Sequence, residues 1–273
     1  MIDKIKIALC QMPVGMDKKT NLDTAVEYIK RASDMGAEMV LLPEMFICPY
    51  SNRYFRSFAE EEGGSAWQQL SDAAKECGVY LAAGTVPELS DDKVYNTCYV
   101  FDSTGRQIAK ARKLHLFKID VPGKKAFDES LTLSAGDSLC SFDSPWGPIG
   151  ITICFDMRFP ELYYKLAERG VRLVLSPADF ALTSGQAHFE LLCRQRATDA
   201  QLFTAVCSLS RDDGCIFEAW AHSMICSPWG EVLADAGIDS GIICKELDLS
   251  YTDEVRGILP VLRSRRPELY NSL

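Results

Sequence analysis

Residues 149–176, IGITICFDMRFPELYYKLAERGVRLVLS, decide the fold class. The first six of these residues form a short apolar run, which predicts a fully buried strand. Residues 160–168 follow as a helix with proline in its first turn, and residues 171–176 form a second apolar run. Strands that alternate with helices in this way indicate an α/β protein.

The alternation continues on both sides of this stretch. Apolar periodicity predicts further strands at 4–9, 38–42, 80–86 and 202–207, and helices at 21–35, 66–77 and 187–198. An antiparallel pair is expected at 94–101 and 107–113, joined by the turn sequence DSTG, with shorter strands near Met224, Val232 and Ile242. Hairpins added to strand–helix units predict mixed sheets. Because no repeat or linker interrupts the pattern, we expect one domain over 1–273, with an extended tail from about residue 257.

Composition and charge exclude several classes of protein. The chain has 273 residues, of which 47% are hydrophobic and 25% charged, as in ordinary globular proteins. Its 29 Lys and Arg against 38 Asp and Glu give a net charge of −9, which disfavours nucleic-acid binding. No stretch without charged residues is long enough to span a membrane, and the N-terminus lacks the apolar core of a signal peptide. We therefore expect a cytoplasmic protein that acts on small molecules or pairs with another copy of itself.

Cysteine usage argues against disulfides and metals. The chain has 11 Cys, most of them inside apolar runs and none in a CxxC pair, which is typical of buried free thiols in a reducing compartment. Zinc sites need clustered Cys and His, and the three histidines, His115, His188 and His222, are far apart in sequence. The glycine motifs that bind dinucleotides or nucleotide phosphates are also missing from the sequence. No metal and no cofactor are expected.

Three residues at strand ends, or directly after them, carry reactive groups: Glu44, Lys113 and Cys154. Open α/β sheets place their sites at such ends. Each has an alternative interpretation: Glu44 as a loop carboxylate, Lys113 as a solvated charge, and Cys154 as a small buried apolar residue. Against the last, Cys154 lies at a strand-to-helix corner, where N–H groups of the helix end would favour the thiolate.

Together the three residues suit nucleophilic catalysis on an amide or nitrile. A Cys154 thiolate would attack the carbon to form a covalent thioester or thioimidate. Glu44 would act as general base, and Lys113, with a backbone N–H near Cys154, would stabilise the oxyanion. No histidine is needed in this scheme.

The surrounding motifs resemble a known family. Glu44 in LLPEMF, Lys113 in KLHLF and Cys154 in ICFDMRFPE are similar to the Glu–Lys–Cys triad of the nitrilase, or carbon–nitrogen hydrolase, superfamily. The resemblance extends from ALCQMPVGMDKKTNL at the start of the chain to LPVLRSRRPELY in its tail. It implies a four-layer αββα sandwich with helices outside mixed sheets, and a homodimer with the tail at its interface.

The resemblance also implies a role for Glu129, in the sequence KKAFDES. A family glutamate at this place positions the catalytic lysine or the substrate. Glu129 lies in the segment 114–138, which has no clean period and is therefore expected to be a functional loop. Without the family, an exposed loop acid would be an equal interpretation.

Within the superfamily the chain is most similar to the omega-amidases. CFDMRFPE resembles the CYDMRF of omega-amidases and deaminated glutathione amidases, and KLHLFKIDVPGKKAFDES, LTSGQAHFELL and SLSRDDG resemble omega-amidases. The implied activity is hydrolysis of the terminal amide of 2-oxoglutaramate or 2-oxosuccinamate to ammonia and a carboxylic acid. The alternatives are a deaminated glutathione amidase or another short aliphatic or carbamoyl amidase. A non-catalytic binding subunit and a redox-sensing thiol protein are the rivals from other classes.

Four residues are candidates for substrate binding. These substrates carry a carboxylate at the end opposite the amide, and Arg158 is the first candidate to bind it. The alternative for Arg158 is a structural ion pair with Asp156 or Glu161. Positions after strand ends suggest Phe155, Phe180 and Thr183 as pocket walls.

Overall fold

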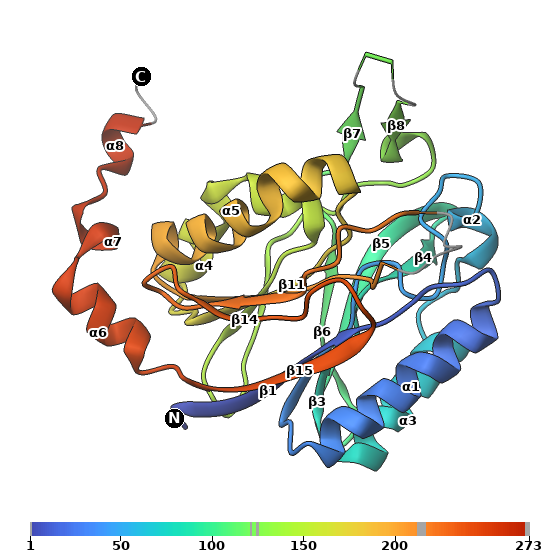
Figure 1. Ribbon diagram of the computed structural model, residues 1–273, viewed down its shortest axis with the longest axis horizontal. Coiled ribbons are helices and arrows are strands. Elements are labelled where there is room, and N and C mark those ends of the chain that lie inside the picture. The colour runs from blue at the N-terminus through green and yellow to red at the C-terminus, as the bar shows by residue number, and fades with distance from the viewer. Residues whose placement is uncertain (1, 121, 124–125, 212–216, 271–273) are drawn as a thin grey trace.

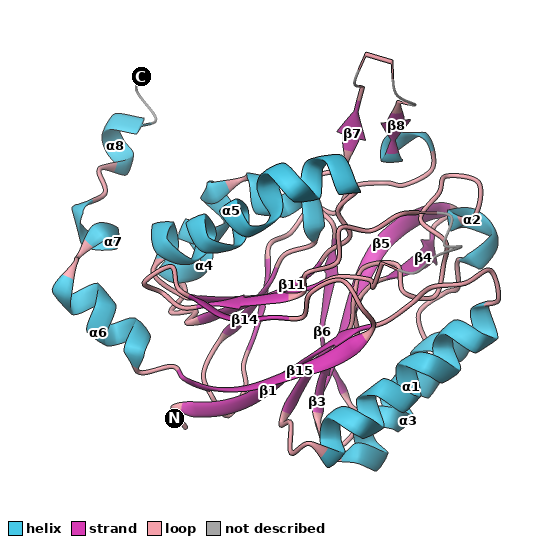
Figure 2. Ribbon diagram, in the orientation of Figure 1, coloured by secondary structure: helices cyan, strands magenta, loops and turns pink. Residues whose placement is uncertain are grey.

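The computed structural model describes residues 2–120, 122–123, 126–211 and 217–270. Its strands form two large mixed sheets and a two-stranded ribbon (Figure 2). In spatial order the first sheet contains β15 (Gly241–Asp248), β1 (Lys4–Gln11), β2 (Met39–Leu41), β3 (Tyr80–Ala82), β5 (Lys93–Phe101) and β4 (Val86–Ser90), and β6 (Gln107–Arg112) also pairs with β5. The second contains β14 (Val232–Asp235), β13 (Met224–Cys226), β12 (Phe203–Cys207), β11 (Leu173–Pro177), β10 (Ile149–Ile151) and β9 (Cys140–Phe142).

Two helices cover the outer face of each sheet (Figure 1). On the first sheet these are α1 (Lys18–Asp34) and α3 (Ser65–Cys77), and on the second α4 (Pro160–Glu168) and α5 (Leu182–Ala200). The order is helix, sheet, sheet, helix, so the predicted α/β arrangement of mixed sheets with helices outside is confirmed.

Alternation along β1 shows how the sequence builds these layers. Ile5, Ile7 and Leu9 point into the core between the two sheets, whereas Ala8 and Cys10 belong to the core beneath α1. Successive side chains of a strand point to opposite faces, so a strand with apolar residues on both faces must lie between two layers.

The edges of several elements differ from the sequence predictions. The expected strand 80–86 is two strands, β3 and β4, separated by a turn at Gly84, and the expected strand 149–154 ends at Ile151. Helix α1 begins three residues earlier than expected, and α5 five residues earlier. The tail expected to be extended from about residue 257 follows α6 (Tyr251–Ile258) and contains the short helices α7 (Val261–Ser264) and α8 (Pro267–Tyr270). Pro260 and Pro267 limit these helices because proline cannot continue a helix begun before it.

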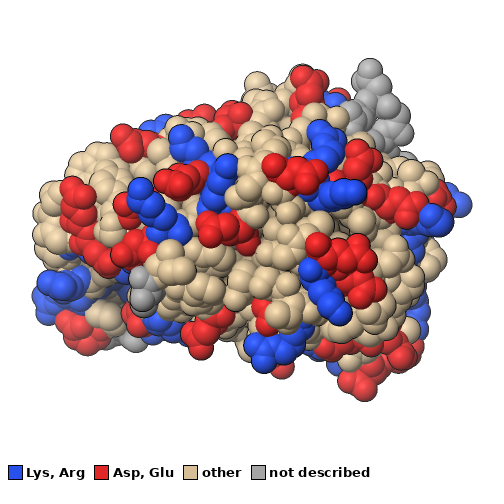
Figure 3. Space-filling view, turned by 90° about the horizontal axis from the view of Figure 1, so that it is seen from below, with Lys and Arg blue, Asp and Glu red and all other residues tan. Residues whose placement is uncertain are grey.

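The surface carries both signs of charge. Figure 3 shows acidic and basic side chains interspersed over one face of the molecule. Among the helices of the described residues, none is long and apolar enough to cross a membrane.

Candidate functional site

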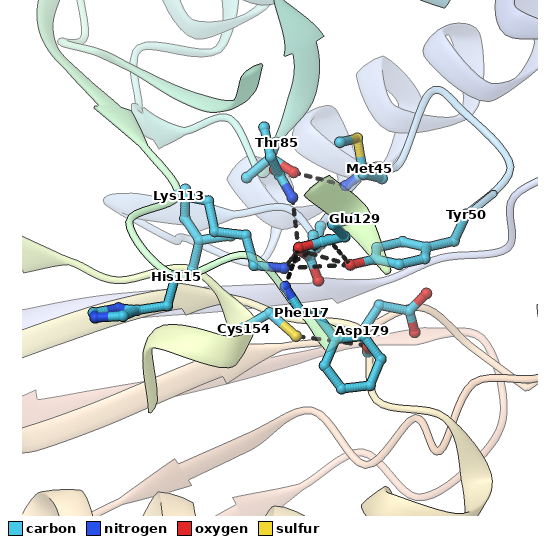
Figure 4. A network of polar contacts seen from close by, with 12 residues as sticks. Met45, Tyr50, Thr85, Lys113, His115, Phe117, Glu129, Cys154 and Asp179 are labelled. Carbon is cyan, nitrogen blue, oxygen red and sulfur yellow. Dashed lines mark hydrogen bonds and ion pairs between the residues drawn. The ribbon is translucent and has the colours of Figure 1, made fainter. Parts of the chain in front are cut away.

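Four predicted residues lie together where strands of both sheets end, and Figure 4 labels three of them, Lys113, Glu129 and Cys154. Glu44 comes after β2 and Lys113 directly after β6, while Cys154 begins the 3-10 turn η2 (Cys154–Arg158) beyond β10. Glu129 begins a second such turn, η1 (Glu129–Leu131), after the ribbon of β7 (Lys118–Ile119) and β8 (Phe127–Asp128). All four side chains are buried.

Glu44, Lys113 and Glu129 form what we call the charge cluster. The Lys113 Nζ lies 2.8 Å from Glu44 Oε1 and 2.9 Å from Glu129 Oε1. The Tyr50 hydroxyl donates a hydrogen bond to Glu129 and lies 3.3 Å from the same Nζ. A buried ammonium between two carboxylates is costly to assemble unless each charge is compensated, and here the lysine is compensated on two sides.

The turn that carries Glu44 is fixed by close backbone contacts. Met45 has a left-handed φ of +51°, and its N–H donates to Thr85 Oγ1 at 2.8 Å. Gly84 has a φ of +55°, and a Cβ there would lie 2.2 Å from the Pro43 carbonyl oxygen, so only glycine fits. The Asn96 side chain donates to Glu44 Oε1 at 2.7 Å. Glu44 Oε2 has no hydrogen-bond partner among the described residues, which leaves it available to accept a proton.

Cys154 is held in a strained backbone conformation. Its φ is +45°, a region that residues other than glycine rarely adopt and that is often found at functional sites. Asp156 supports this turn by accepting from the N–H groups of Ile153 at 3.0 Å and His115 at 2.9 Å. The thiol lies 3.6 Å from the backbone oxygen of Asp179.

Electrostatics make the Cys154 thiol neutral at rest. Burial, together with the nearby Glu44 carboxylate, raises the pKa of Cys154 well above its usual range. A thiol with a raised pKa needs a base to remove its proton, which is the role expected of Glu44. Burial also raises the pKa of Glu44, although Lys113 opposes the shift.

Lys113 keeps its charge despite its burial. Burial by itself lowers the pKa of an ammonium, but Glu129 and Glu44 outweigh this effect and raise the pKa of Lys113 well above its usual range. A neutral thiol next to a carboxylate and a permanent cation can transfer its proton to the carboxylate and form a thiolate only when it reacts.

A small cavity of about 10 Å³ lies beside Cys154, and we call it the Cys154 cavity. Its wall is formed by Phe117, Cys154, Phe155, Arg158, Asp179, Phe180, Ala181 and Ser184. Three of the four predicted pocket residues, Phe155, Arg158 and Phe180, therefore lie where they were expected. Thr183 does not line this cavity: it is exposed on the first turn of α5, and the neighbouring Ser184 takes its place.

Arg158 makes no ion pair among the described residues. Its guanidinium nitrogens lie 3.4 Å from Nδ1 of His188, and its carbon lies 5.6 Å from the ring centres of both Phe155 and Phe180. The alternative of a pair with Asp156 is not realised, because that carboxylate binds His115 and Ile153. Arg158 thus presents an uncompensated cation at the cavity wall.

Sequence reasoning missed Tyr50, Asn96 and Asp179. Tyr50 and Asn96 are single polar residues in mostly apolar surroundings, and no spacing pattern distinguishes them. Asp179 had a usable signal, because it follows the end of β11 just as Glu44 follows β2. Among the described residues, no group of three or more His, Cys, Asp or Glu side chains is arranged to hold a metal ion.

Comparisons with known proteins agree with this site. The family model for carbon–nitrogen hydrolases matches residues 6–257. Omega-amidase NIT2 of Homo sapiens is 47% identical over 265 residues, or 97% of this chain and 96% of the human protein. Omega-amidase NIT2-A of Xenopus laevis is 47% identical over 98% of this chain and 97% of its own length.

Among solved structures, Nit3 of Saccharomyces cerevisiae is described as a member of branch 10 of the nitrilase superfamily. It matches with a TM-score of 0.89 and 37% identity, covering 97% of each chain. Fold, site geometry, family model and relatives agree. The chain therefore belongs to the carbon–nitrogen hydrolase family of the nitrilase superfamily and is a carbon–nitrogen amide hydrolase.

Proposed function

We propose that this enzyme is an omega-amidase that hydrolyses the terminal amide of 2-oxoglutaramate and 2-oxosuccinamate, with Cys154 as nucleophile. The observation that carries the mechanism is the buried Lys113, which is held 2.8 Å from Glu44 and 2.9 Å from Glu129 and lies near Cys154 (Figure 4). The relatives named omega-amidase support the choice of substrate.

The first half-reaction forms a thioester. Glu44 takes the proton of the Cys154 thiol as the sulfur attacks the amide carbon, so that a C–S bond forms and the carbonyl oxygen becomes an oxyanion. Lys113 remains protonated and stabilises this oxyanion. The C–N bond then breaks, Glu44 returns the proton to nitrogen, and ammonia leaves.

The second half-reaction consumes water. Glu44 takes a proton from a water molecule, whose oxygen attacks the thioester carbon, and the C–S bond breaks to release the carboxylic acid. The proton held by Glu44 returns to the sulfur, so the site is restored. Glu129 and Tyr50 act as positioning residues, because their hydrogen bonds hold the Lys113 ammonium in place.

The Cys154 cavity suits a short anionic amide. The rings of Phe155 and Phe180 would bound the carbon chain, and Arg158 would bind the carboxylate opposite the amide. A deaminated glutathione amidase or another short aliphatic or carbamoyl amidase would use the same nucleophile and base. The relatives named omega-amidase favour the short 2-oxo amides over these alternatives.

We place the enzyme in the cytoplasm as a homodimer. Ten free thiols among the described residues fit a reducing compartment, while Cys215 lies outside those residues. The C-terminal segment exposes large apolar side chains, among them Ile258 at 64% and Leu259 at 52%, which a second copy would cover. Light scattering on Leu259→Asp tests this: a dimer that becomes monomeric supports the assignment, and an unchanged mass contradicts it.

The decisive experiment measures ammonia release from 2-oxoglutaramate, 2-oxosuccinamate, deaminated glutathione, N-carbamoylputrescine and a simple nitrile. We expect the first two to be preferred, and Cys154→Ala to lower their turnover by at least about 10⁴-fold. Cys140→Ala removes a thiol on β9 outside the cavity and is the matched control. Preference for deaminated glutathione would replace the proposed substrate, and full activity of Cys154→Ala would refute the mechanism.

A further inference from the structure

Asp179 is a buried acidic side chain that the mechanism above does not use. It is only 4% exposed, and neither of its carboxyl oxygens has a hydrogen-bond partner among the described residues. Buried polar groups in proteins are almost always paired, because an unpaired one loses its hydration without compensation. We therefore expect an unpaired carboxyl group at a cavity wall to form its hydrogen bond with a bound ligand.

The position of Asp179 is next to the nucleophile. Its backbone oxygen lies 3.6 Å from the Cys154 thiol, and Asp179 lines the Cys154 cavity together with Phe117 and Arg158. Figure 4 shows Asp179 beside Phe117, with its backbone oxygen toward the Cys154 sulfur and its carboxyl group pointing away from that sulfur. Asp179 and the reactive sulfur therefore line the same small cavity.

The other polar groups of the cavity wall are already assigned. Cys154 faces the amide carbon, and Arg158 faces the far carboxylate. The Ser184 hydroxyl donates to the Ala181 backbone oxygen at 3.2 Å. A 2-oxo acid amide has a third polar group, its oxo oxygen, between the amide and the carboxylate. Asp179 is the remaining polar side chain of the cavity wall that could contact this oxygen.

The oxo oxygen accepts hydrogen bonds, so Asp179 must donate one and must carry a proton. Burial, together with the nearby Glu44 carboxylate, raises the pKa of Asp179 well above its usual range. Lys113 opposes this shift only in part, because it is already bound to Glu44 and Glu129. An ionised Asp179 would also repel the substrate carboxylate and the oxyanion.

From the cavity geometry we infer that Asp179 is a specificity-determining residue whose protonated carboxyl donates a hydrogen bond to the oxo oxygen of the substrate. This inference rests on the proposed 2-oxo amide substrate. It makes the enzyme discriminate 2-oxo amides from otherwise identical amides that carry hydrogen or an amino group at that carbon.

The test compares three amides that differ at one carbon: 2-oxoglutaramate, its deoxy analogue glutaramate, and L-glutamine. We expect the wild type to prefer the oxo compound over the deoxy compound by about ten- to a hundredfold in kcat/KM. Asp179→Ala should reduce this ratio to near one, whereas Asp179→Asn, whose amide can still donate, should keep most of it. A merely structural role would lower the rates for both substrates together and leave the ratio unchanged.

Three results would overturn the inference: a wild type without preference, an Asp179→Ala variant that keeps the ratio, or a preference for L-glutamine that Asp179→Ala abolishes. The last would mean an ionised Asp179 that binds an ammonium group.

Binding of the product acid separates this inference from the proposed function. Thermal shifts with 2-oxoglutarate and with glutarate need no turnover. If the wild type hydrolyses none of the amides, the proposed function fails. A larger shift with 2-oxoglutarate that Asp179→Ala removes would still support the contact, and equal shifts in both proteins would refute it.

Discussion

The charge cluster and the wall of the Cys154 cavity lie side by side, yet they treat polar groups in opposite ways. In the cluster, Lys113 contacts two carboxylates and approaches the Tyr50 hydroxyl. In the wall, Arg158 pairs with no carboxylate and the Asp179 carboxyl group has no hydrogen bond among the described residues. The difference corresponds to two tasks. The paired charges of the cluster are in place before the substrate binds, whereas the unpaired groups of the wall find their partners only on the substrate.

Removing the lysine should have the largest effect on both stability and rate. Lys113→Met leaves Glu44 and Glu129 as buried, unpaired carboxylates, so we expect the free energy of unfolding to fall by about 3–5 kcal/mol. We also expect kcat to fall by about 10³-fold because the oxyanion loses its cation. Denaturation curves and ammonia release measure the two effects.

Lys110→Met is the matched control, because Lys110 also binds two carboxylates, those of Glu62 and Glu88, but is partly exposed and outside the cluster. A Lys113→Met protein that unfolds at the same denaturant concentration as the wild type would show that the cluster is not a compensated unit.

Changes in the wall should affect binding instead. Arg158→Gln is expected to raise KM for 2-oxoglutaramate by about ten- to a hundredfold, since it removes a charged partner of the carboxylate. Hydrolysis of an uncharged short amide should change little. Steady-state kinetics on both substrates measure this, with Arg169→Gln as control because its guanidinium binds the Leu139 backbone outside the cavity. Equal losses on both amides would contradict the assignment.

Tyr50→Phe tests the outer support of the charge cluster. The variant loses the hydroxyl that donates to Glu129 and lies 3.3 Å from Lys113, so we expect kcat to fall by about tenfold with little change in KM. Tyr163→Phe removes a buried hydroxyl 2.9 Å from Thr152 and should retain full activity. If the two variants have the same kcat, Tyr50 does not position the lysine.

The smallest expected effect is on the pH dependence of stability. The pKa of Asp179 is higher in the folded than in the unfolded state, so its contribution is present below about pH 4 and is lost as the pH rises toward the folded value. Asp179→Asn removes this loss. Relative to wild type, the variant should therefore gain stability between pH 4.5 and pH 7.

Calorimetric melting of both proteins at the two pH values measures the gain as a larger difference between their melting temperatures at pH 7 than at pH 4.5. A constant difference would mean that Asp179 titrates normally in the folded state.

The same contrast explains what the sequence could predict. Glu44, Lys113 and Cys154 stand at the ends of apolar runs, and local periodicity locates such ends. Tyr50 and Asn96 are defined by partners distant in sequence, and no local pattern records those partners. The error at Thr183 has a local cause: α5 starts at Leu182 rather than at 187, and this turns residue 183 outward and residue 184 inward.

Long-range pairing was also beyond sequence reasoning. A strand near Ile242 was expected, but its pairing with β1 was not. The sequence of an eight-residue strand does not indicate which sheet edge the strand will pair with. The raised pKa of the Cys154 thiol could not be predicted for a similar reason. It results from burial and from the nearby Glu44 carboxylate, and both depend on segments far apart in the chain.

The pairing of β1 with β15 has a consequence for biosynthesis. Lys4–Gln11 lies antiparallel to Gly241–Asp248. The first strand to leave the ribosome therefore cannot pair along this edge until one of the last strands has been synthesised. Until then β1 presents an open edge, which can pair with other chains. Activity would then appear only after release of the chain from the ribosome, and not as soon as the catalytic residues have been synthesised. Nascent chains that stall before residue 241 would depend on chaperones to cover that edge.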